Sequence, residues 1–327
     1  MKDVLLVIRL GAMGDVLHTL PAVASLKKSF PEKKIAWLIS RKWAPLVAGN
    51  PYIDDLISFD RSESASLRRV RGELKALRPA VALDFQGLLQ SAIAARLARP
   101  ARLFGFDRSV AREPLAALLY TDRIRVTGPH RIERNLQLAA AAGARELWQE
   151  SWIPLGSPEV DLPHGPFVLT SPFAGWGSKQ WPLERYGELA NRLAREGLPL
   201  VANVPPERAG ELHPYKDLTV HSSSLAGLID ATRRAAAVVG VDSGPLHLAA
   251  ALKKPGVALF GPTDPAQTGP FDSPMIVLRQ TGVETTYKRG QATHASMSGI
   301  SVPEVAEALL RSMTRAREVL AAPAGSQ

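Results

Sequence analysis

The sequence predicts an α/β protein made of two doubly wound domains in tandem, each built on a parallel sheet. The chain has 327 residues, about the length of two domains of ordinary size. Short apolar runs alternate with amphipathic segments in both halves, as in parallel strands joined by helices. A segment rich in proline and glycine separates the halves, and the alternation starts again behind it.

The first half opens with a buried strand that leads through a glycine loop into a helix. Val4–Leu10 is an apolar run with β-branched residues, Gly11–Gly14 follow, and a helical pattern extends from Asp15 to Lys28. Further strands are expected at 34–40, 55–59 and 80–84, with helices at 62–78 and 88–98. This order predicts a sheet that is covered by helices on both faces.

A linker is expected in the stretch Trp152–Pro166, which holds four prolines and two glycines. Behind it, strands are expected at 167–170, 200–204, 238–241 and 257–260, with helices at 182–196, 225–236 and 245–252. The sequence therefore predicts an N-terminal domain at 1–155, a linker at 156–166, a C-terminal domain at 167–301, a closing helix at 302–320 and a tail at 321–327.

Composition excludes several classes of protein. With 46% hydrophobic and 22% charged residues, the chain is typical of globular and not of disordered proteins. The absence of cysteine excludes disulfides, thiolate catalysis and cysteine-ligated zinc. No apolar run reaches about 18 residues and no signal-peptide pattern is visible, so we expect a cytoplasmic protein.

Positive charge is concentrated in the first half of the chain. Residues 1–150 contain 24 Lys and Arg against 15 Asp and Glu, whereas the remainder contains 16 of each kind. This asymmetry indicates an anionic partner for the first half: nucleic acid, an acidic membrane surface or a phosphorylated substrate. Solubility alone is the other interpretation of the charge.

The first candidate site is the loop behind the first strand. The segment Arg9–Asp15 matches neither the dinucleotide fingerprint nor the P-loop, which argues against an NAD enzyme or a kinase. Asp15 stands where strand gives way to helix, so it is either a helix N-cap or a general base at the mouth of a cleft. His18 is expected one turn away on the same helix face.

The second candidate site is the strand-to-helix turn in residues 241–250. Asp242, Ser243 and Gly244 stand at the expected start of a helix, whose free N–H groups and dipole suit a diphosphate. A well-formed helix N-terminus is the other interpretation, with Asp242 or Ser243 as the cap. That interpretation leaves His247, one turn into the helix, unexplained.

A third loop, residues 171–182, brings Ser178 and Lys179 to the same edge of the expected sheet. Lysine in such a loop is suited to a phosphate, although a solvated polar loop is the alternative. The chain has no Asp-x-Asp pair and no metal-binding histidine spacing, so no metal is expected. A leaving diphosphate would then be stabilised by backbone N–H groups, Lys179 and His247.

Five motifs carry a resemblance to a known family: Met13–Ala22, Asp84–Gly87, Ala111–Leu115, Lys179–Pro182 and Asp242–His247. Together they resemble the ADP-heptose:lipopolysaccharide heptosyltransferases of glycosyltransferase family 9, most closely the type I enzymes. The resemblance continues through Gly261–Pro265 to the last helix and so covers nearly the whole chain. It implies the GT-B architecture, in which two tandem Rossmann-like domains hold the active site in the cleft between them.

The resemblance also implies the reaction. The family inverts the anomeric centre while moving L-glycero-D-manno-heptose from ADP-heptose to the Kdo region of lipid A, at the inner face of the cytoplasmic membrane. No cofactor would be required, and the partners would be the donor, the acceptor and an anionic membrane surface, without nucleic acid. By motif, Asp15 would be the catalytic base. The donor-binding residues would be Ser178, Lys179, Asp242, Ser243, Gly244 and His247, and the acceptor-binding residues His18, Arg61, Arg68, Arg69, Gln86 and Arg112.

Two motifs depart from the type I pattern. The donor turn reads Ser243-Gly-Pro-Leu-His247 where type I enzymes typically have Thr-Gly-Leu-Ser-His, and Ala174–Ser178 replaces a threonine-rich segment. One alternative is a relative that uses another nucleotide sugar or adds a later heptose. The other is a non-catalytic sugar-nucleotide-binding protein, which would be expected to lack the base.

Overall fold

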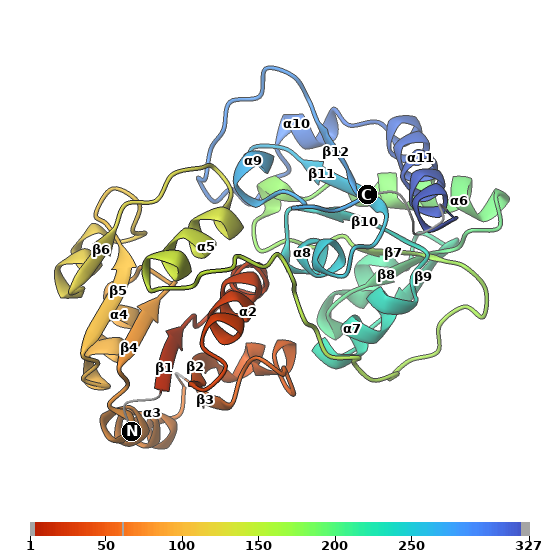
Figure 1. The fold of residues 1–327 in the computed structure, drawn as a ribbon. Helices are drawn as coiled ribbons and strands as arrows, with labels where there is room; N and C mark the ends of the chain where they lie inside the picture. The colour runs from red at the N-terminus through yellow and green to blue at the C-terminus, as the bar shows by residue number, and fades with distance from the viewer. Residues whose placement is uncertain (1–3, 61, 322–327) are drawn as a thin grey trace. The chain divides into compact units, whose positions relative to one another are not determined.

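A computed structural model describes residues 4–60 and 62–321 of the chain. The chain divides into two compact units, unit 1 at Met1–Pro154 and unit 2 at Leu155–Gln327. Each unit contains a six-stranded sheet in which all paired strands are parallel, with helices between the strands (Figure 1). The predicted fold class, two doubly wound α/β units in tandem, is confirmed.

The sheet of unit 1 has the strand order β3-β2-β1-β4-β5-β6. Its strands are β1 (Val4–Ile8), β2 (Lys34–Ser40), β3 (Asp55–Phe59), β4 (Val81–Asp84), β5 (Arg102–Phe106) and β6 (Asp122–Ile124). Its helices are α1 (Met13–Leu17), α2 (Leu20–Ser29), η1 (Arg41–Leu46), α3 (Ser64–Leu77), α4 (Leu89–Leu97), η2 (Pro114–Leu119) and α5 (Arg131–Ala141), of which η1 and η2 are 3₁₀ helices. The order reverses between β1 and β4, so the loops behind these two strands are the expected place for a ligand.

Both faces of this sheet are buried. Leu6 and Ile8 of β1 belong to a core cluster that is completed by α3, α4 and η2. Leu5 and Val7 alternate with them and are also buried, as expected for a strand covered on both sides. Helices α2 and α5 pack against each other (Figure 1).

The sheet of unit 2 has the order β12-β11-β10-β7-β8-β9 and reverses between β10 and β7. Its strands are β7 (Val168–Ser171), β8 (Leu200–Asn203), β9 (Leu218–His221), β10 (Ala237–Val241), β11 (Gly256–Phe260) and β12 (Ile276–Arg279). Its helices are η3 (Gly177–Lys179), α6 (Leu183–Arg195), η4 (Pro206–Leu212), α7 (Leu225–Arg234), α8 (Gly244–Ala251), α9 (Pro265–Thr268), α10 (Ala295–Ser298) and α11 (Val302–Ala321). Helices α6 and α11 share one core cluster with the sheet.

One expected helix is divided in the structure. The sequence predicted a continuous helix from Asp15 to Lys28, but α1 ends at Leu17 and α2 begins at Leu20. Pro21 explains the break, because proline has no amide hydrogen for the carbonyl of Leu17 and its ring clashes with that carbonyl. The hydroxyl of Thr19 instead donates to the backbone oxygen of Asp15 at 2.8 Å.

Four strands and three α-helices were not predicted: β5, β6, β9, β12, α5, α9 and α10. Strands β6 and β12 lie at the edges of their sheets, and β6 has only three residues, Asp122–Ile124. Two of the three residues of β6 are charged, so this strand lacks the apolar run that marks a buried strand. Among the described residues, no helix is both long and apolar enough to cross a membrane.

Candidate functional site

Asp15 lies behind the carboxyl end of β1, as the third residue of α1. The N-cap position of this helix belongs to Ala12, so the interpretation of Asp15 as an N-cap is wrong. The carboxylate still serves the first turn, because its Oδ2 accepts a hydrogen bond from the backbone N–H of Ala12 at 3.3 Å. Helix capping therefore accounts for only one of the contacts of Asp15.

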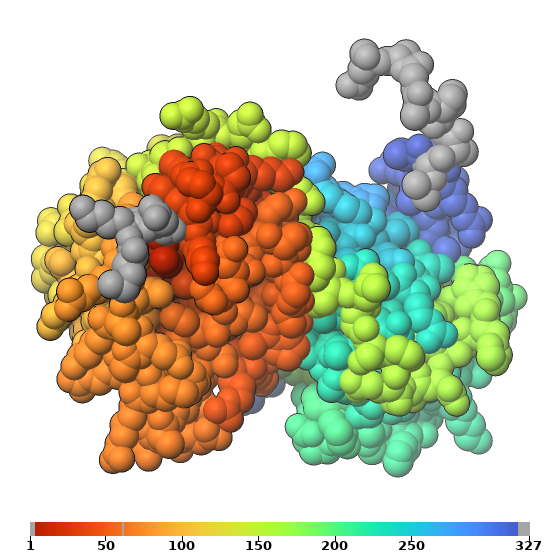
Figure 2. All heavy atoms as spheres, turned by 60° about the horizontal axis from the view of Figure 1, so that its bottom comes forward, coloured from red at the N-terminus to blue at the C-terminus, as the bar shows by residue number. Residues whose placement is uncertain are grey.

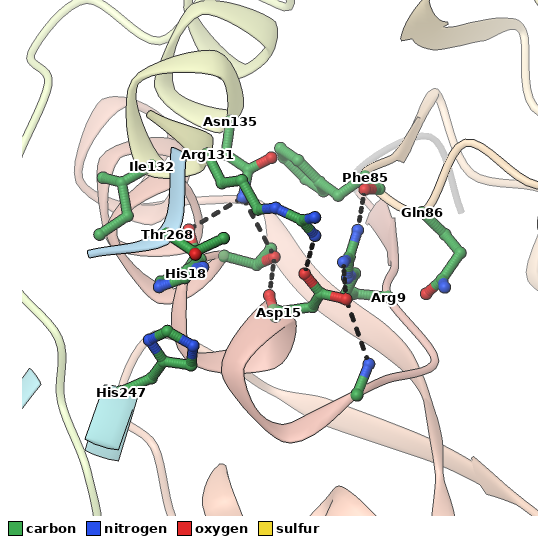
Figure 3. Close-up of polar contacts among 12 residues, drawn as sticks. Arg9, Asp15, His18, Phe85, Gln86, Arg131, Ile132, Asn135, His247 and Thr268 are labelled. Atoms are coloured by element: carbon green, nitrogen blue, oxygen red, sulfur yellow. Dashed lines mark hydrogen bonds and ion pairs between the residues drawn. The ribbon is translucent and has the colours of Figure 1, made fainter. Parts of the chain in front are cut away.

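Two arginines hold the carboxylate of Asp15. Arg9 Nη2 lies 2.6 Å from Oδ2, and Arg131 Nη1 lies 2.5 Å from Oδ1. Figure 3 shows the two guanidinium groups pointing at the same carboxylate. The side chains of Arg9 and Asp15 are only 8% and 12% exposed, whereas that of Arg131 is 39% exposed. One partner of Asp15 is thus buried and fixed, and the other reaches solvent.

The arginines set the charge of Asp15. Burial alone raises the pKa of this carboxyl group, but the charges of Arg9 and Arg131 outweigh burial and hold the pKa well below its usual range. Asp15 is therefore ionised at neutral pH. A carboxylate with such a low pKa is a weak base, and it becomes a stronger one when a cationic partner leaves.

Arg9 itself is anchored on several sides. It follows β1 directly, and its Nη1 donates a hydrogen bond to the backbone oxygen of Phe85 behind β4. Trp37 Nε1 donates to the backbone oxygen of Arg9 at 3.1 Å. Burial lowers the pKa of Arg9, and the charge of Asp15 opposes this effect. Arg9 thus links the ends of the two central strands to the carboxylate.

A buried hydrogen-bond network shapes the loop behind β4. Asp84 accepts hydrogen bonds from the hydroxyls of Ser91 at 2.7 Å and Tyr120 at 2.8 Å, and from the backbone N–H of Gln86 at 2.9 Å. Burial raises the pKa of Asp84, although these donors favour its ionised form. Gln86 Oε1 in turn accepts from the backbone N–H of Leu10 at 3.0 Å. Gln86 therefore joins the loops behind β1 and β4.

Gly87 brings Arg112 to the same loop. Its φ of +68° lies in the left-handed region that favours glycine, and an added Cβ would lie 3.2 Å from the backbone nitrogen of Arg112. The carbonyl of Gly87 accepts a hydrogen bond from the N–H of Glu113 at 2.9 Å. Arg112 is exposed beside this tight contact.

The other residues expected to bind the acceptor lie on helix α3, at the end of helix α1, or outside the described residues. Arg68 and Arg69 lie on the exposed side of α3, and Arg69 is engaged by Glu73 at 2.6 Å. Arg61 lies outside the described residues. His18 is the buried C-terminal cap of α1, and its ring meets that of His130 edge to face at 5.5 Å between centroids.

In unit 2 the structure brings Lys179, Asp242 and His247 together. Lys179 Nζ lies 2.5 Å from Asp242 Oδ2, and His247 Nε2 lies 3.3 Å from Asp242 Oδ1. Burial raises the pKa of Asp242, but the hydrogen bond from His247 and the charge of Lys179 outweigh it and lower the pKa. The ammonium of Lys179 also lies over the ring of Trp176, 4.4 Å from its centroid.

Two buried hydroxyls accompany this cluster. Ser243 occupies the N-cap position of α8, directly before Gly244, but makes no capping hydrogen bond. Its Oγ and that of Ser178 are buried without a hydrogen-bond partner among residues 4–60 and 62–321. Because buried polar groups are normally paired, these hydroxyls and the free N–H groups of α8 indicate a site for a polar ligand.

Sequence analysis missed Arg9, Arg131 and Thr268 as site residues. The sequence could have indicated Arg9, because a charged residue at the end of a buried apolar run needs a partner of opposite charge. Arg131 had none, because it stands 116 residues from Asp15 and in a helix that was not predicted. Thr268 donates to Asp242 Oδ1 at 3.3 Å from the short helix α9, which the sequence did not indicate either.

Two tandem doubly wound units, one with a buried ionised carboxylate and one with a polar site at a helix N-terminus, have the architecture of the GT-B glycosyltransferases. A model of glycosyltransferase family 9 (heptosyltransferase) matches residues 67–295. The chain belongs to this family and is a heptosyltransferase.

Individual relatives agree with this assignment. Lipopolysaccharide heptosyltransferase 1 of Pseudomonas aeruginosa is 32% identical over 294 residues, which are 84% of this chain and 82% of the relative. The protein of the same name from Escherichia coli strain K12 is 29% identical over 318 residues, 90% of this chain and 99% of the relative. The structure of E. coli heptosyltransferase WaaC with ADP superposes with a TM-score of 0.78 at 26% identity, covering 94% of this chain and 99% of that one.

The two arginines of Asp15 should differ in their contribution to stability. Arg9→Met leaves a buried carboxylate without its buried partner, so it should lower the free energy of unfolding by about 3 to 5 kcal/mol. Arg131→Met removes a half-exposed partner and should lower it by about 1 kcal/mol or less. Chemical denaturation of both variants measures the difference, and equal losses would contradict the distinction between a fixed and a movable partner.

Proposed function

We propose that this chain transfers heptose from ADP-heptose to the Kdo region of lipid A, in the inner core of lipopolysaccharide, by a single inverting displacement. The proposal is carried by Asp15, a carboxylate held ionised at the carboxyl edge of the sheet of unit 1. It is supported by the similarity to WaaC, whose structures are described with ADP and with ADP-2-deoxy-2-fluoro heptose. Unit 2 binds the donor and unit 1 binds the acceptor.

In the proposed donor site, the diphosphate lies at the N-terminus of α8. The N–H groups of Gly244 and Leu246 in the first turn, where Pro245 has none, and the hydroxyl of Ser243 donate to phosphate oxygens. Lys179 supplies the positive charge, and Asp242 orients it through the 2.5 Å contact. These groups stabilise the charge that develops on ADP as its bond to the sugar breaks.

In the proposed displacement, Asp15 removes the proton from the acceptor hydroxyl while that oxygen attacks the anomeric carbon. Each oxygen of the carboxylate is paired with an arginine, and both positive charges weaken Asp15 as a base, so loss of one arginine would strengthen it. Arg131 is the partner that moves, because it is half exposed, whereas Arg9 is buried and also bound to Phe85. An anionic group of the acceptor attracts Arg131 away from Asp15, which raises the pKa of Asp15 and makes it a stronger base.

Replacement of Asp15 separates its catalytic role from its structural one. Asp15→Asn removes the base and should lower kcat by about 10² to 10⁴, with ADP-sugar affinity retained because the donor site belongs to unit 2. It also leaves Arg9 without a charged partner, so unit 1 should be less stable. The control Asp15→Glu keeps the charge but displaces it by one methylene, and it should recover stability more fully than turnover. Wild-type kcat in Asp15→Asn would reject the mechanism.

The pH dependence of the reaction tests the movable arginine. In Arg131→Gln one of the charges that lower the pKa of Asp15 is gone, so that pKa rises towards its ordinary value. Activity requires the ionised form and is lost as pH falls through this pKa. The acidic limb of the kcat/KM profile should therefore move to higher pH in the variant. Arg134→Gln, on the same helix and bound to the carbonyl of Gly128, is the control whose profile should match the wild type.

Direct assay tests the proposed function as a whole. Purified protein, ADP-heptose and Kdo-lipid A should give a product that is heavier by one heptose, and deletion of the gene should truncate the lipopolysaccharide core directly behind Kdo. Turnover only with an acceptor that already carries heptose would assign the chain to a later step. Turnover with a different nucleotide sugar alone would reject the proposed donor.

A further inference from the structure

Helix α4 packs with two alanines inward and with two of its larger apolar residues outward, while its last residue, Leu97, packs against the core. Ala92 and Ala95 are fully buried in the core cluster of unit 1. Leu89 and Ile93, on the opposite side, are 37% and 49% exposed. An ordinary amphipathic helix does the reverse, because burial of the larger apolar side chain contributes more to stability.

The neighbouring 3₁₀ helix η2 repeats this inversion. Ala116 and Ala117 are buried in the same core cluster, whereas Leu115 and Leu118 are 63% and 66% exposed. Side chains three residues apart eclipse one another in a 3₁₀ helix, so the two leucines stand above one another on the outer side. Two of the three leucines of η2 are thus exposed to solvent, and the third, Leu119, packs against the core cluster.

Helices α4 and η2 form one surface. The carboxylate of Glu113, just before η2, accepts a hydrogen bond from the backbone N–H of Leu89 at 2.6 Å. Figure 1 labels α4 in unit 1, and Figure 2 shows orange to yellow residues, the colour range that includes α4 and η2, at the surface of unit 1. We call their four exposed apolar residues the apolar patch: Leu89, Ile93, Leu115 and Leu118.

Arginines flank the apolar patch. Arg96 and Arg99 stand at the C-terminal end of α4, and Arg112 stands before η2; all three are exposed. Within the described part of the chain, none of these three takes part in an ion pair. Glu113 is the one acidic residue in the segments 89–99 and 112–119, and it is held by the N–H of Leu89. The surface is apolar in the middle and cationic around it.

We propose that the apolar patch and its arginines dock unit 1 onto a bilayer that contains anionic lipid. The apolar side chains enter the interface between headgroups and acyl chains, and the arginines contact lipid phosphates. A second copy of this chain fits the surface less well, because a symmetric dimer would bring the same unpaired arginines face to face. The inference rests on the proposed function, in which the acceptor is a lipid, and it places Arg112 beside both the bilayer and the acceptor.

Vesicle binding tests the surface without relying on activity. The wild type should sediment with vesicles of phosphatidylethanolamine and phosphatidylglycerol. Ile93→Glu/Leu118→Glu, which changes two exposed side chains, should weaken this binding by at least about tenfold, since each substitution replaces apolar area with charge. Leu155→Glu/Val319→Glu is the control in unit 2, where the two residues are 78% and 76% exposed, and it should bind like the wild type.

Kinetics separate docking from the transfer reaction. With a water-soluble, deacylated acceptor, the Ile93/Leu118 variant should match the wild type, whereas with acceptor embedded in vesicles its kcat/KM should fall. Wild-type vesicle binding by this variant, or no vesicle binding by the wild type, would overturn the inference. So would a wild-type dimer that the substitutions dissociate in sedimentation velocity. If the wild type binds vesicles but transfers no heptose, and the Ile93/Leu118 variant loses vesicle binding, the docking inference is supported and only the proposed function is rejected.

Discussion

The ion pair between Arg9 and Asp15 is the interaction on which the organisation of unit 1 depends. Two groups that are costly to bury are placed behind the central strand, and each is tolerated because the other is present. Arg9 extends the contact to Phe85 behind β4, so the pair spans the point where the strand order reverses. Topology predicts a ligand site at such a reversal, and the buried ion pair places two charged groups at this point of the sheet.

Unit 2 also contains a buried carboxylate with cationic partners, but there the carboxylate positions a cation. Asp242 stands behind the carboxyl end of β10, beside the point of reversal, and it binds Lys179 and His247. In unit 1 the arginines hold a carboxylate, the proposed base, in its ionised form. In unit 2 the carboxylate holds an ammonium group in place beside the N-terminus of α8. Both arrangements fix charged groups before a substrate arrives, which reduces the reorganisation needed during reaction.

Much of the architecture was predictable because it follows from local patterns. The strands at 34–40 and 55–59 have the predicted bounds. The first is a buried parallel strand and forms a continuous apolar run, and the second is an edge strand that keeps a short apolar run. The edge strand β6 was not predictable, because Asp122–Ile124 contains two charged residues and no apolar run. The continuous helix expected from Asp15 to Lys28 was wrong, because Pro21 stands in the first turn of a new helix, α2.

The site was predictable only in part, for a related reason. Asp15, Lys179 and Asp242 stand behind strands, where motif and topology point to them. Arg131 binds Asp15 across 116 residues, and no local pattern contains that information. The alanines of α4 and the leucines of η2 look like ordinary core residues in the sequence. Only the exposed fractions in the folded chain show that the alanines are buried and that Leu115 and Leu118 are exposed.

The central claim is that Asp15 becomes the base when Arg131 leaves it, and a crystal structure with an unreactive ADP-heptose analogue and the acceptor tests it most directly. The account predicts that an Asp15 oxygen lies about 2.6 to 3.2 Å from the acceptor hydroxyl, with Arg131 moved to an anionic group of the acceptor and Arg9 still in place. A ternary complex in which Arg131 remains on Asp15, and the hydroxyl faces another residue, would contradict it.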